Sequence, residues 1–399
     1  MPKELKVVIK REFEDKIKDG YPLILGEFIE DWSSVNKQGS ILKLYSSSGN
    51  FVAKAYYGEQ NKGKGWVLTY QKSELIDVDF FKAKFIKAIE YRDEFFKSKE
   101  TTAFRLFNGE GDGIGGLSID YYDGFLVITW YSLGIFEFKD TVLKALKKSL
   151  EFKGIYQKRR FDAKGQYVGD DSDFLEGSKA PEPLIVKENG VNFAVYLDDG
   201  AMVGVFLDQK DVRAAIRDSY AKDRVFLNTF SYTGAFSVYA ALGGAKETTS
   251  VDLAKRSLPK TKEQFSVNGI DIEKQKIVVA DVFDYFKYAL RKGFKYDMVV
   301  VDPPSFARSK KRTFSASKDY TKLLKEIIAI TNKGGVIVAS TNAANFGMMK
   351  FRTFVDKAFR DLNIKYKIEQ SFSLPKDFRV NENFIEGNYL KVLFIKKIG

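Results

Sequence analysis

Residues 296–306 read YDMVVVDPPSF, and this stretch decides the fold of the 399-residue chain. A short apolar, β-rich run that stops at an acid and two prolines predicts a buried parallel strand ending at Asp302. In open α/β sheets, ligands bind outside the carboxyl ends of such strands. Pro303 and Pro304 fix two φ angles and remove two N–H donors, so nearby carbonyls stay rigid and free. Together with the ring of Phe306, this arrangement suits a planar base that presents N–H groups. A strand that simply stops at a turn is the alternative.

Three more strands are predicted upstream, each followed by a polar residue. They cover residues 224–228, 248–252 and 276–280, with helices expected at 235–242 and 254–267. Asp252 ends the second strand about 18 residues after Gly234, and an acid near this distance commonly binds ribose hydroxyls. Asp281 follows the third strand and can accept from an adenine amino group. With Asp302, these acids predict a doubly wound sheet whose carboxylates share one ligand site.

The turn after the first strand, residues 229–234, indicates which nucleotide fits. A pyrophosphate needs the close backbone approach of a G-x-G-x-x-G pattern, whereas this turn has a single glycine. Its other positions hold Phe230, Ser231, Tyr232 and Thr233. S-adenosylmethionine has no phosphate and carries a sulfonium cation, which acids and aromatic faces attract. We therefore expect this cofactor and place NAD or FAD behind it.

Several segments together resemble a known family. They are residues 203–210 with Arg213, residues 228–234, residues 251–253, and the DPP-x-F-x-x-S-K run at 302–311. The chain resembles the bacterial class I S-adenosylmethionine-dependent methyltransferases of large-subunit ribosomal RNA that carry an N-terminal PUA domain. The resemblance implies a base methyltransferase with catalytic residues Asp302, Pro303, Pro304 and Phe306. It implies cofactor contacts from Phe206, Asp208, Gln209, Arg213, Asn228, Phe230, Ser231, Tyr232, Thr233, Gly234, Asp252, Leu253, Asp281, Val282 and Asp302. For Arg213, an ion pair with a nearby acid is the alternative.

One departure from this family concerns the acceptor atom. The best-known members make 5-methylcytosine, which requires a cysteine thiolate to attack C6 first. The chain contains no cysteine, and Asn342 stands where that cysteine would fall. Transfer to a nitrogen needs no such adduct, so we favour a nitrogen acceptor on a flipped base stacked against Phe306. The alternative is a catalytically degenerate RNA-binding assembly factor that still binds the cofactor.

The amino-acid composition narrows the possible classes of protein and of functional site further. The chain has no histidine, so serine–histidine triads, His/Cys metal sites and histidine acid–base catalysis are excluded, and no metal site is expected. The absence of cysteine and of an apolar N-terminal segment fits a cytoplasmic protein. A net charge of +12 favours RNA as partner, although solubility alone can explain it. Arg308, Lys310, Lys311 and Arg312 follow the DPP motif and are expected to bind RNA. A homodimer is left open.

Three domains are expected. Residues 1–72 alternate in period two around turn signals and predict a small β-rich, PUA-like RNA-binding domain. Residues 73–185 predict a central α+β domain that ends in a polar linker at 163–183. One amphipathic helix is expected at 79–99 and another at 136–152. Residues 186–399 form the expected methyltransferase domain with a Rossmann-like, mostly parallel sheet.

Overall fold

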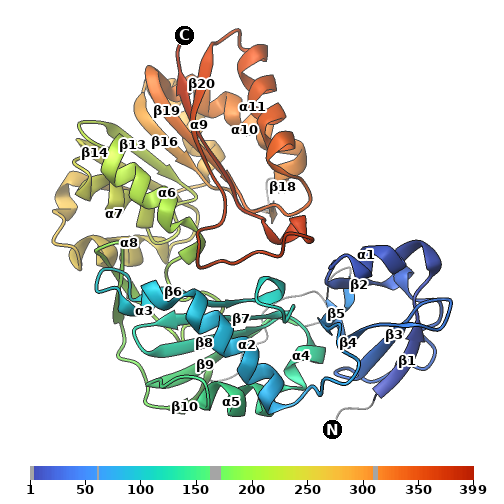
Figure 1. Ribbon diagram of the computed structural model, residues 1–399. Helices are drawn as coiled ribbons and strands as arrows, with labels where there is room; N and C mark the ends of the chain where they lie inside the picture. Colours follow the sequence, from blue (N-terminus) through green and yellow to red (C-terminus); the bar gives the residue numbers. More distant parts are fainter. Residues whose placement is uncertain (1–3, 61–62, 162–171, 309–312) are drawn as a thin grey trace. The chain divides into compact units, whose positions relative to one another are not determined.

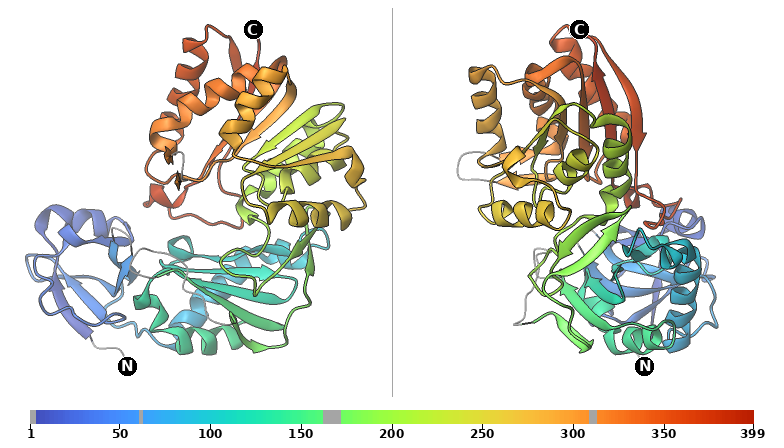
Figure 2. Two further views of the ribbon diagram at one scale, coloured as in Figure 1. Left: turned by 180° about the vertical axis from the view of Figure 1, so that it is seen from behind. Right: turned by 90° about the vertical axis from the view of Figure 1, so that its left-hand side faces the viewer.

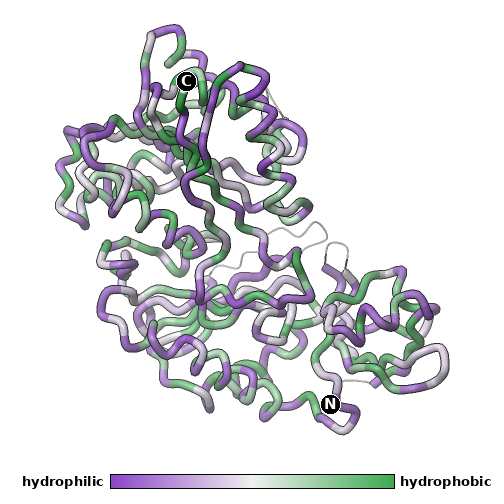
Figure 3. The backbone as a smooth tube through the Cα atoms, turned by 45° about the horizontal axis from the view of Figure 1, so that its top comes forward, coloured by the Kyte–Doolittle hydropathy of each residue, from purple (hydrophilic) through white to green (hydrophobic). Residues whose placement is uncertain are grey.

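The computed structural model describes residues 4–60, 63–161, 172–308 and 313–399. The chain divides into two compact units. The first comprises residues 1–186, 195–203 and 376–387, and the second comprises 187–194, 204–375 and 388–399. Hydrophobic and hydrophilic stretches alternate along the backbone of each unit in Figure 3.

The N-terminal part of the first unit is a small five-stranded sheet (Figure 1). The expected hairpin around residues 46–50 is present, because the flanking strands pair antiparallel with Tyr45 opposite Phe51. The outermost strand runs parallel to its neighbour, with Glu4 opposite Ile41. In sheet order the strands are β1 (Glu4–Val8), β3 (Ile41–Tyr45), β4 (Phe51–Gln60), β5 (Gly63–Thr69) and β2 (Leu23–Leu25), and α1 (Glu14–Lys18) precedes β2.

A second five-stranded sheet follows in the same unit. Asp123 and Gly124 join two of its strands in left-handed conformations, which a tight two-residue hairpin turn requires. The strands in order are β10 (Phe174–Gly177), β9 (Gly154–Arg159), β8 (Phe125–Trp130), β7 (Leu117–Tyr122) and β6 (Ala103–Asn108). The helices are α2 (Val78–Tyr91), α3 (Asp93–Lys97), α4 (Leu133–Phe136) and α5 (Lys139–Lys147).

Two helix predictions in this unit were wrong in extent. The helix expected at 79–99 is interrupted at Arg92, whose φ of −108° is not helical. The guanidinium of Arg92 is fully buried and donates to both carboxylate oxygens of Asp112 and to the carbonyl of Asp377. Because these bonds fix the position of the side chain, the backbone of Arg92 departs from helical geometry and the helix ends there. The helix expected at 136–152 is instead α4 and α5, divided at Phe138, which lies outside helical geometry.

The segment expected to be a linker is partly structured. Residues 162–171 lie outside the described part of the chain. Asp173 is buried and accepts a 2.5 Å ion-paired hydrogen bond from Lys158, and the chain then enters edge strand β10. The polar composition of the segment did not indicate a buried acid or a strand. In the sequence, an aspartate that pairs with a buried lysine cannot be told from an aspartate that lies in solvent.

The second unit is a doubly wound seven-stranded sheet, as expected (Figure 2). Five strands run parallel, and the last two pair antiparallel. In sheet order the strands are β15 (Gln275–Val279), β14 (Glu247–Asp252), β13 (Val225–Thr229), β16 (Tyr296–Val301), β19 (Thr331–Thr341), β21 (Lys391–Lys397) and β20 (Tyr366–Phe372). Two short hairpins accompany it: β11 (Leu184–Glu188) with β12 (Val191–Val195), and β17 (Phe306–Arg308) with β18 (Thr313–Ser315).

Both faces of this sheet are buried, which explains why its strands read as continuous apolar runs. Along β16, Val299 and Val301 belong to one core, and Met298 and Val300 belong to the core on the opposite face. The first core contains α9 (Val282–Lys292), α10 (Ala316–Ile330) and α11 (Met348–Asp361). The second contains α6 (Lys210–Ala215) and α7 (Ala235–Leu242), and α8 (Ser257–Ser266) packs against α7.

Candidate functional site

The expected ligand residues lie along one edge of the second unit's sheet. Thr229 pairs with Val251 on one side and Val301 on the other, and Asp252 pairs with Val279. The parallel strands β13, β14, β15 and β16 therefore end at the same level. The residues that follow them, including the three predicted acids, share the carboxyl edge where ligands bind in this architecture.

The turn between β13 and α7 is held in an unusual conformation. Phe230 and Tyr232 have positive φ angles of 56° and 50°, which cost free energy for side chains other than glycine. Gly234 has a φ of 78° and begins α7, and a Cβ there would come within 2.4 Å of Thr261. Ser231 donates its N–H to the carbonyl of Val251. Such strain is typical of a segment shaped for a ligand.

Two predicted residues of this region serve partly as supports. The hydroxyl of Thr233 donates to the carbonyl of Gly204 at 2.7 Å, which ties the turn to the 203–213 segment. Asn228 is buried, and its amide donates to the hydroxyl of Ser237 on α7. The Nδ2 of Asn228 is therefore engaged within the fold, whereas its buried Oδ1 has no donor among the described residues.

Asp252 is oriented by backbone amides from two segments. Its Oδ2 accepts from the N–H of Tyr232 at 2.9 Å, and its Oδ1 accepts from the N–H of Ala254 at 2.8 Å. The carboxylate is thereby fixed between the end of β14 and the strained turn. Leu253, the next residue, is 59% exposed, which leaves an apolar face beside this acid.

Asp281, which follows β15 at the expected place, also caps a helix. Its Oδ1 accepts from the N–H groups of Phe283 and Asp284, so the residue caps the N-terminus of α9. The side chain of Val282 is buried in the core, and its ligand contact would be limited to the backbone. The ring of Phe283 packs edge-on against Phe230 at 6.0 Å between centroids.

Asp302 is the most perturbed acid at this edge. Its Oδ2 accepts from Nε2 of Gln209 at 3.1 Å, and the same Nε2 donates to the hydroxyl of Ser340 at 2.8 Å. Burial raises the pKa of Asp302 to about 6, and the negative charge of Asp208 acts in the same direction. Asp208 itself accepts a 3.0 Å hydrogen bond from the hydroxyl of Tyr389. The carboxyl group can therefore change its charge near neutral pH.

A buried acceptor beside Asp302 provides a test of ligand fit. Oε1 of Gln209 has no hydrogen-bond donor among the residues the structure describes, although its side chain is only 4% exposed. Next to it lie two acids, Asp208 and Asp302. A ligand that brings N–H donors and positive charge would satisfy this set, as the aminoalkyl group and sulfonium of S-adenosylmethionine do. The residues present fit the expected cofactor.

Arg213 takes the alternative role left open for it. Its guanidinium is 1% exposed and donates to both carboxylate oxygens of Glu188 at 2.7 Å, and also to the carbonyl of Phe206. The hydroxyl of Tyr239 donates to Glu188 as well. A cofactor contact from Arg213 thus stays a prediction, whereas the ion pair is observed. Nothing in the sequence marked Glu188 as its partner.

Exposed aromatic rings flank the edge. Phe306 is 63% exposed directly after the DPP motif, and Phe206 is 44% exposed and lies 5.3 Å from the ring of Tyr232. Large apolar side chains left in water beside a site commonly mark a binding surface. Phe306 therefore has the exposure that stacking on a base would need.

Asn342 lies beside the DPP motif. The hydroxyl of Ser305 donates to Oδ1 of Asn342 at 2.5 Å. The residue at the position expected for a cysteine is therefore an amide in contact with the motif. Of the predicted basic cluster, Arg308 ends β17, and Lys310, Lys311 and Arg312 lie outside the described residues.

Comparison with known proteins identifies the class. Residues 104–376 match the family of S-adenosylmethionine-dependent methyltransferases, and residues 7–70 match a PUA-like domain. Among curated proteins, Bacillus subtilis (strain 168) YwbD, provisionally named a ribosomal RNA large subunit methyltransferase, is 56% identical over 98% of this chain and 99% of its own. Ribosomal RNA large subunit methyltransferase I of Aeromonas salmonicida (strain A449) is 30% identical over 94% of this chain and 95% of its own.

A solved structure agrees with this result. The crystal structure of SMU.776, provisionally called a methyltransferase and complexed with SAH, has a TM-score of 0.91 and 40% identity, covering 98% of this chain and all of that one. The chain belongs to the S-adenosylmethionine-dependent methyltransferase family, with a PUA-like N-terminal domain. It is an S-adenosylmethionine-dependent methyltransferase, which confirms the predicted fold class, enzyme class and cofactor.

No helix in the described part of the chain is long and apolar enough to cross a membrane. Over the same residues, no group of three or more acidic, histidine or cysteine side chains could hold a metal ion.

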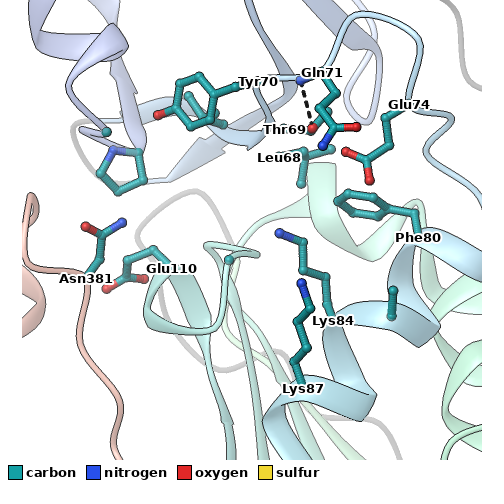
Figure 4. A pocket seen from close by; sticks show the side chains of 15 residues that line it. Leu68, Thr69, Tyr70, Gln71, Glu74, Phe80, Lys84, Lys87, Glu110 and Asn381 are labelled. Atoms are coloured by element: carbon teal, nitrogen blue, oxygen red, sulfur yellow. Dashed lines mark hydrogen bonds between the residues drawn. The ribbon is translucent and has the colours of Figure 1, made fainter.

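The first unit contains a separate pocket of about 330 Å³ (Figure 4). Lys84 and Lys87 point into it from α2, and Glu74 and Glu110 lie on its other sides. Burial raises the pKa of Glu110 to about 7 and lowers the pKa of Lys84. Because both charge signs line this pocket, its electrostatics favour no single class of ligand.

Proposed function

We propose that this enzyme methylates a base of large-subunit ribosomal RNA in the cytoplasm. The observation that carries the proposal is Asp302, a carboxyl group at a parallel strand end, followed by two prolines and a ring that is 63% exposed. Support for ribosomal RNA comes from the names of relatives that align over nearly the whole chain. The net charge of +12 and the PUA-like domain agree with an RNA partner. Homodimer formation and the two domain boundaries, after residues 72 and 185, stay predictions.

We further propose a nitrogen acceptor. Methylation at cytosine C5 needs a thiolate that attacks C6, and this chain has no cysteine. In its predicted place, Asn342 accepts a hydrogen bond from Ser305 and offers no nucleophile. Transfer to an exocyclic or ring nitrogen needs only that the lone pair be oriented toward the methyl group.

The roles of the individual residues follow from their chemistry. S-adenosylmethionine supplies an electrophilic methyl group when bound. The carboxylate of Asp302 and the carbonyls around Pro303 and Pro304 would accept hydrogen bonds from the target N–H groups, which orients the nitrogen and raises its electron density. Phe306 would stack on the base after it leaves its helix. Asp252 would bind the ribose hydroxyls of the cofactor, and Asp281 its adenine amino group.

Mass spectrometry of ribosomal RNA tests the proposal directly. We expect RNA from a deletion strain to lack one methylated nucleoside of the large subunit, and purified enzyme to restore it with labelled S-adenosylmethionine. The missing nucleoside should carry its methyl group on nitrogen. Loss of 5-methylcytosine would refute the nitrogen acceptor but keep the RNA substrate. Failure to transfer to any ribosomal RNA of the deletion strain would favour an assembly factor without catalysis.

A further inference from the structure

A groove of about 500 Å³ lies between two helices of the methyltransferase unit, α10 and α11. Four exposed cations line it: Lys318, Lys350, Lys357 and Arg360. We call it the α10–α11 groove. Thr321 and Phe354 line it between the cations, where the hydroxyl of Thr321 donates to the carbonyl of Phe354 and joins the two helices. The groove is thus part of a packed helix pair. The two helices are drawn in orange-red shades in Figure 1.

The charge in this groove is unbalanced. Its single acid, Asp361, already forms a 2.6 Å ion pair with Lys325. The four lining cations therefore face one carboxylate whose charge another lysine compensates. A solvated helix face usually mixes both signs, whereas a stretch of one sign favours a polyanion.

The cations follow the geometry of one helix face. Lys350, Lys357 and Arg360 occupy positions i, i+7 and i+10, which lie on the same side of an α-helix. At 1.5 Å of rise per residue they cover about 15 Å along the axis of α11. This length suits a chain of repeated charges better than a single small anion.

The groove begins at the catalytic edge of the sheet. Helix α10 connects parallel strands β16 and β19, and α11 follows β19, so both helices start at the carboxyl ends of these strands. Lys318 and Lys350 are each the third residue of their helix. Asn342, which contacts the DPP motif through Ser305, lies between β19 and α11. The line of cations therefore leads away from the site at which the base would be methylated.

We propose that the α10–α11 groove binds the phosphate backbone of the RNA strand that carries the target nucleotide. This inference rests on the function proposed above and assigns it a second contact surface, distinct from the predicted basic cluster at residues 308–312. Lysine and arginine at this spacing provide sequence-independent phosphate contacts, which position the strand but do not read its bases. An acidic protein is the competing occupant, but it would not explain why the groove starts at the catalytic edge.

A matched pair of triple variants tests the proposal. The groove variant is Lys318→Gln/Lys350→Gln/Lys357→Gln. The control, Lys262→Gln/Lys287→Gln/Lys292→Gln, removes the same charge from exposed lysines on α8 and α9. The probe is large-subunit ribosomal RNA from the deletion strain, with binding measured between about 50 and 200 mM salt, the range over which phosphate contacts change affinity most visibly. Calorimetry with S-adenosylhomocysteine verifies that each variant is folded.

For the groove variant, the magnitude of the slope of log K for RNA binding against log[salt] should be about 2 to 3 smaller than for wild type. Each lost phosphate contact lowers this magnitude by about 0.7 to 0.9. Its KM for RNA should rise at least about fivefold, with kcat at saturating RNA unchanged, because phosphate contacts position the strand uniformly. The control should match wild type. Equal slopes in the groove variant and the control would overturn the proposal and leave the groove to another partner. Wild-type enzyme that neither binds nor methylates the RNA would instead refute the proposed function.

Discussion

Nε2 of Gln209 donates a hydrogen bond of 3.1 Å to Oδ2 of Asp302, across 93 positions of the chain. This bond joins the segment before α6 to the end of β16 and leaves Oε1 of the same amide without a donor. One side chain thus both holds the acid proposed to be catalytic and keeps an unpaired acceptor beside it.

Replacing Asp302 should abolish methyl transfer and preserve cofactor binding. Asp302→Ala removes the acceptor for the target N–H groups, and loss of one such oriented group lowers kcat by about 100-fold or more. S-adenosylhomocysteine should still bind within a few fold of wild type by calorimetry. A variant that loses cofactor affinity and activity to the same degree would assign Asp302 to the cofactor rather than to the base.

Activity should depend on the charge of Asp302. Burial raises the pKa of this carboxyl to about 6, so it is ionised above that pH and protonated below it. A protonated group accepts fewer hydrogen bonds, and kcat/KM should fall as the pH decreases through about 6. Asp302→Asn should remove this limb of the profile. The experiment is single-turnover transfer to ribosomal RNA between pH 5 and 8, and an unchanged limb in the variant would assign the titration to another group.

Replacing Asp252 should mainly weaken cofactor binding. Its carboxylate is fixed by the N–H groups of Tyr232 and Ala254, which leaves the acid poised for paired ribose hydroxyls. Loss of hydrogen bonds to a charged group costs about 1.5 to 3 kcal/mol, so Asp252→Ala should weaken S-adenosylhomocysteine about 10- to 100-fold. Asp218→Asn, an exposed acid paired only with its neighbour Arg217 in the observed contacts, is the control and should bind normally. Equal affinity of Asp252→Ala and wild type would contradict the assignment.

Arg213 distinguishes a structural role from a cofactor role. Both partners of its ion pair with Glu188 are buried, so Arg213→Met leaves an uncompensated carboxylate and should cost about 3 to 5 kcal/mol of stability. The double variant Arg213→Met/Glu188→Met should recover most of this loss, as measured by urea denaturation. If the single variant keeps its stability but loses affinity for S-adenosylhomocysteine, the cofactor contact expected from the sequence is correct.

Glu110 should make the stability of the first unit depend on pH. Burial raises its pKa from 4.5 to about 7 in the folded chain. Between these values the folded state keeps a proton that the unfolded state has lost, so the stability contributed by this group is fully present below pH 4.5 and is lost as the pH rises through about 7. Glu110→Gln cannot ionise and should be more stable than wild type above pH 7. Thermal denaturation of wild type and Glu110→Gln at pH 5 and pH 8 measures this. The same change in melting temperature between the two pH values in both proteins would contradict the prediction.

The doubly wound sheet was predictable because its information is local. The apolar run at 296–301 and the helix at 235–242 appear in the structure with the expected bounds. Acids placed directly after strands must share one edge when the strands are parallel, so the positions of Asp252, Asp281 and Asp302 follow from the order of elements. Their individual roles stay predictions.

Other features depended on contacts that no local pattern records. Arg92 interrupts a continuous amphipathic pattern because, in the core, the carboxylate of Asp112 neutralises it and the carbonyl of Asp377, far along the chain, accepts a hydrogen bond from it. Arg213 meets Glu188 only after the chain folds back through β11 and α6. The pattern of apolar residues therefore determined the elements and their order, because burial acts on every residue in turn. Which buried charges are paired, and which carboxyl is left to titrate, was decided by the tertiary structure, because desolvation and Coulomb energies depend on distances in space.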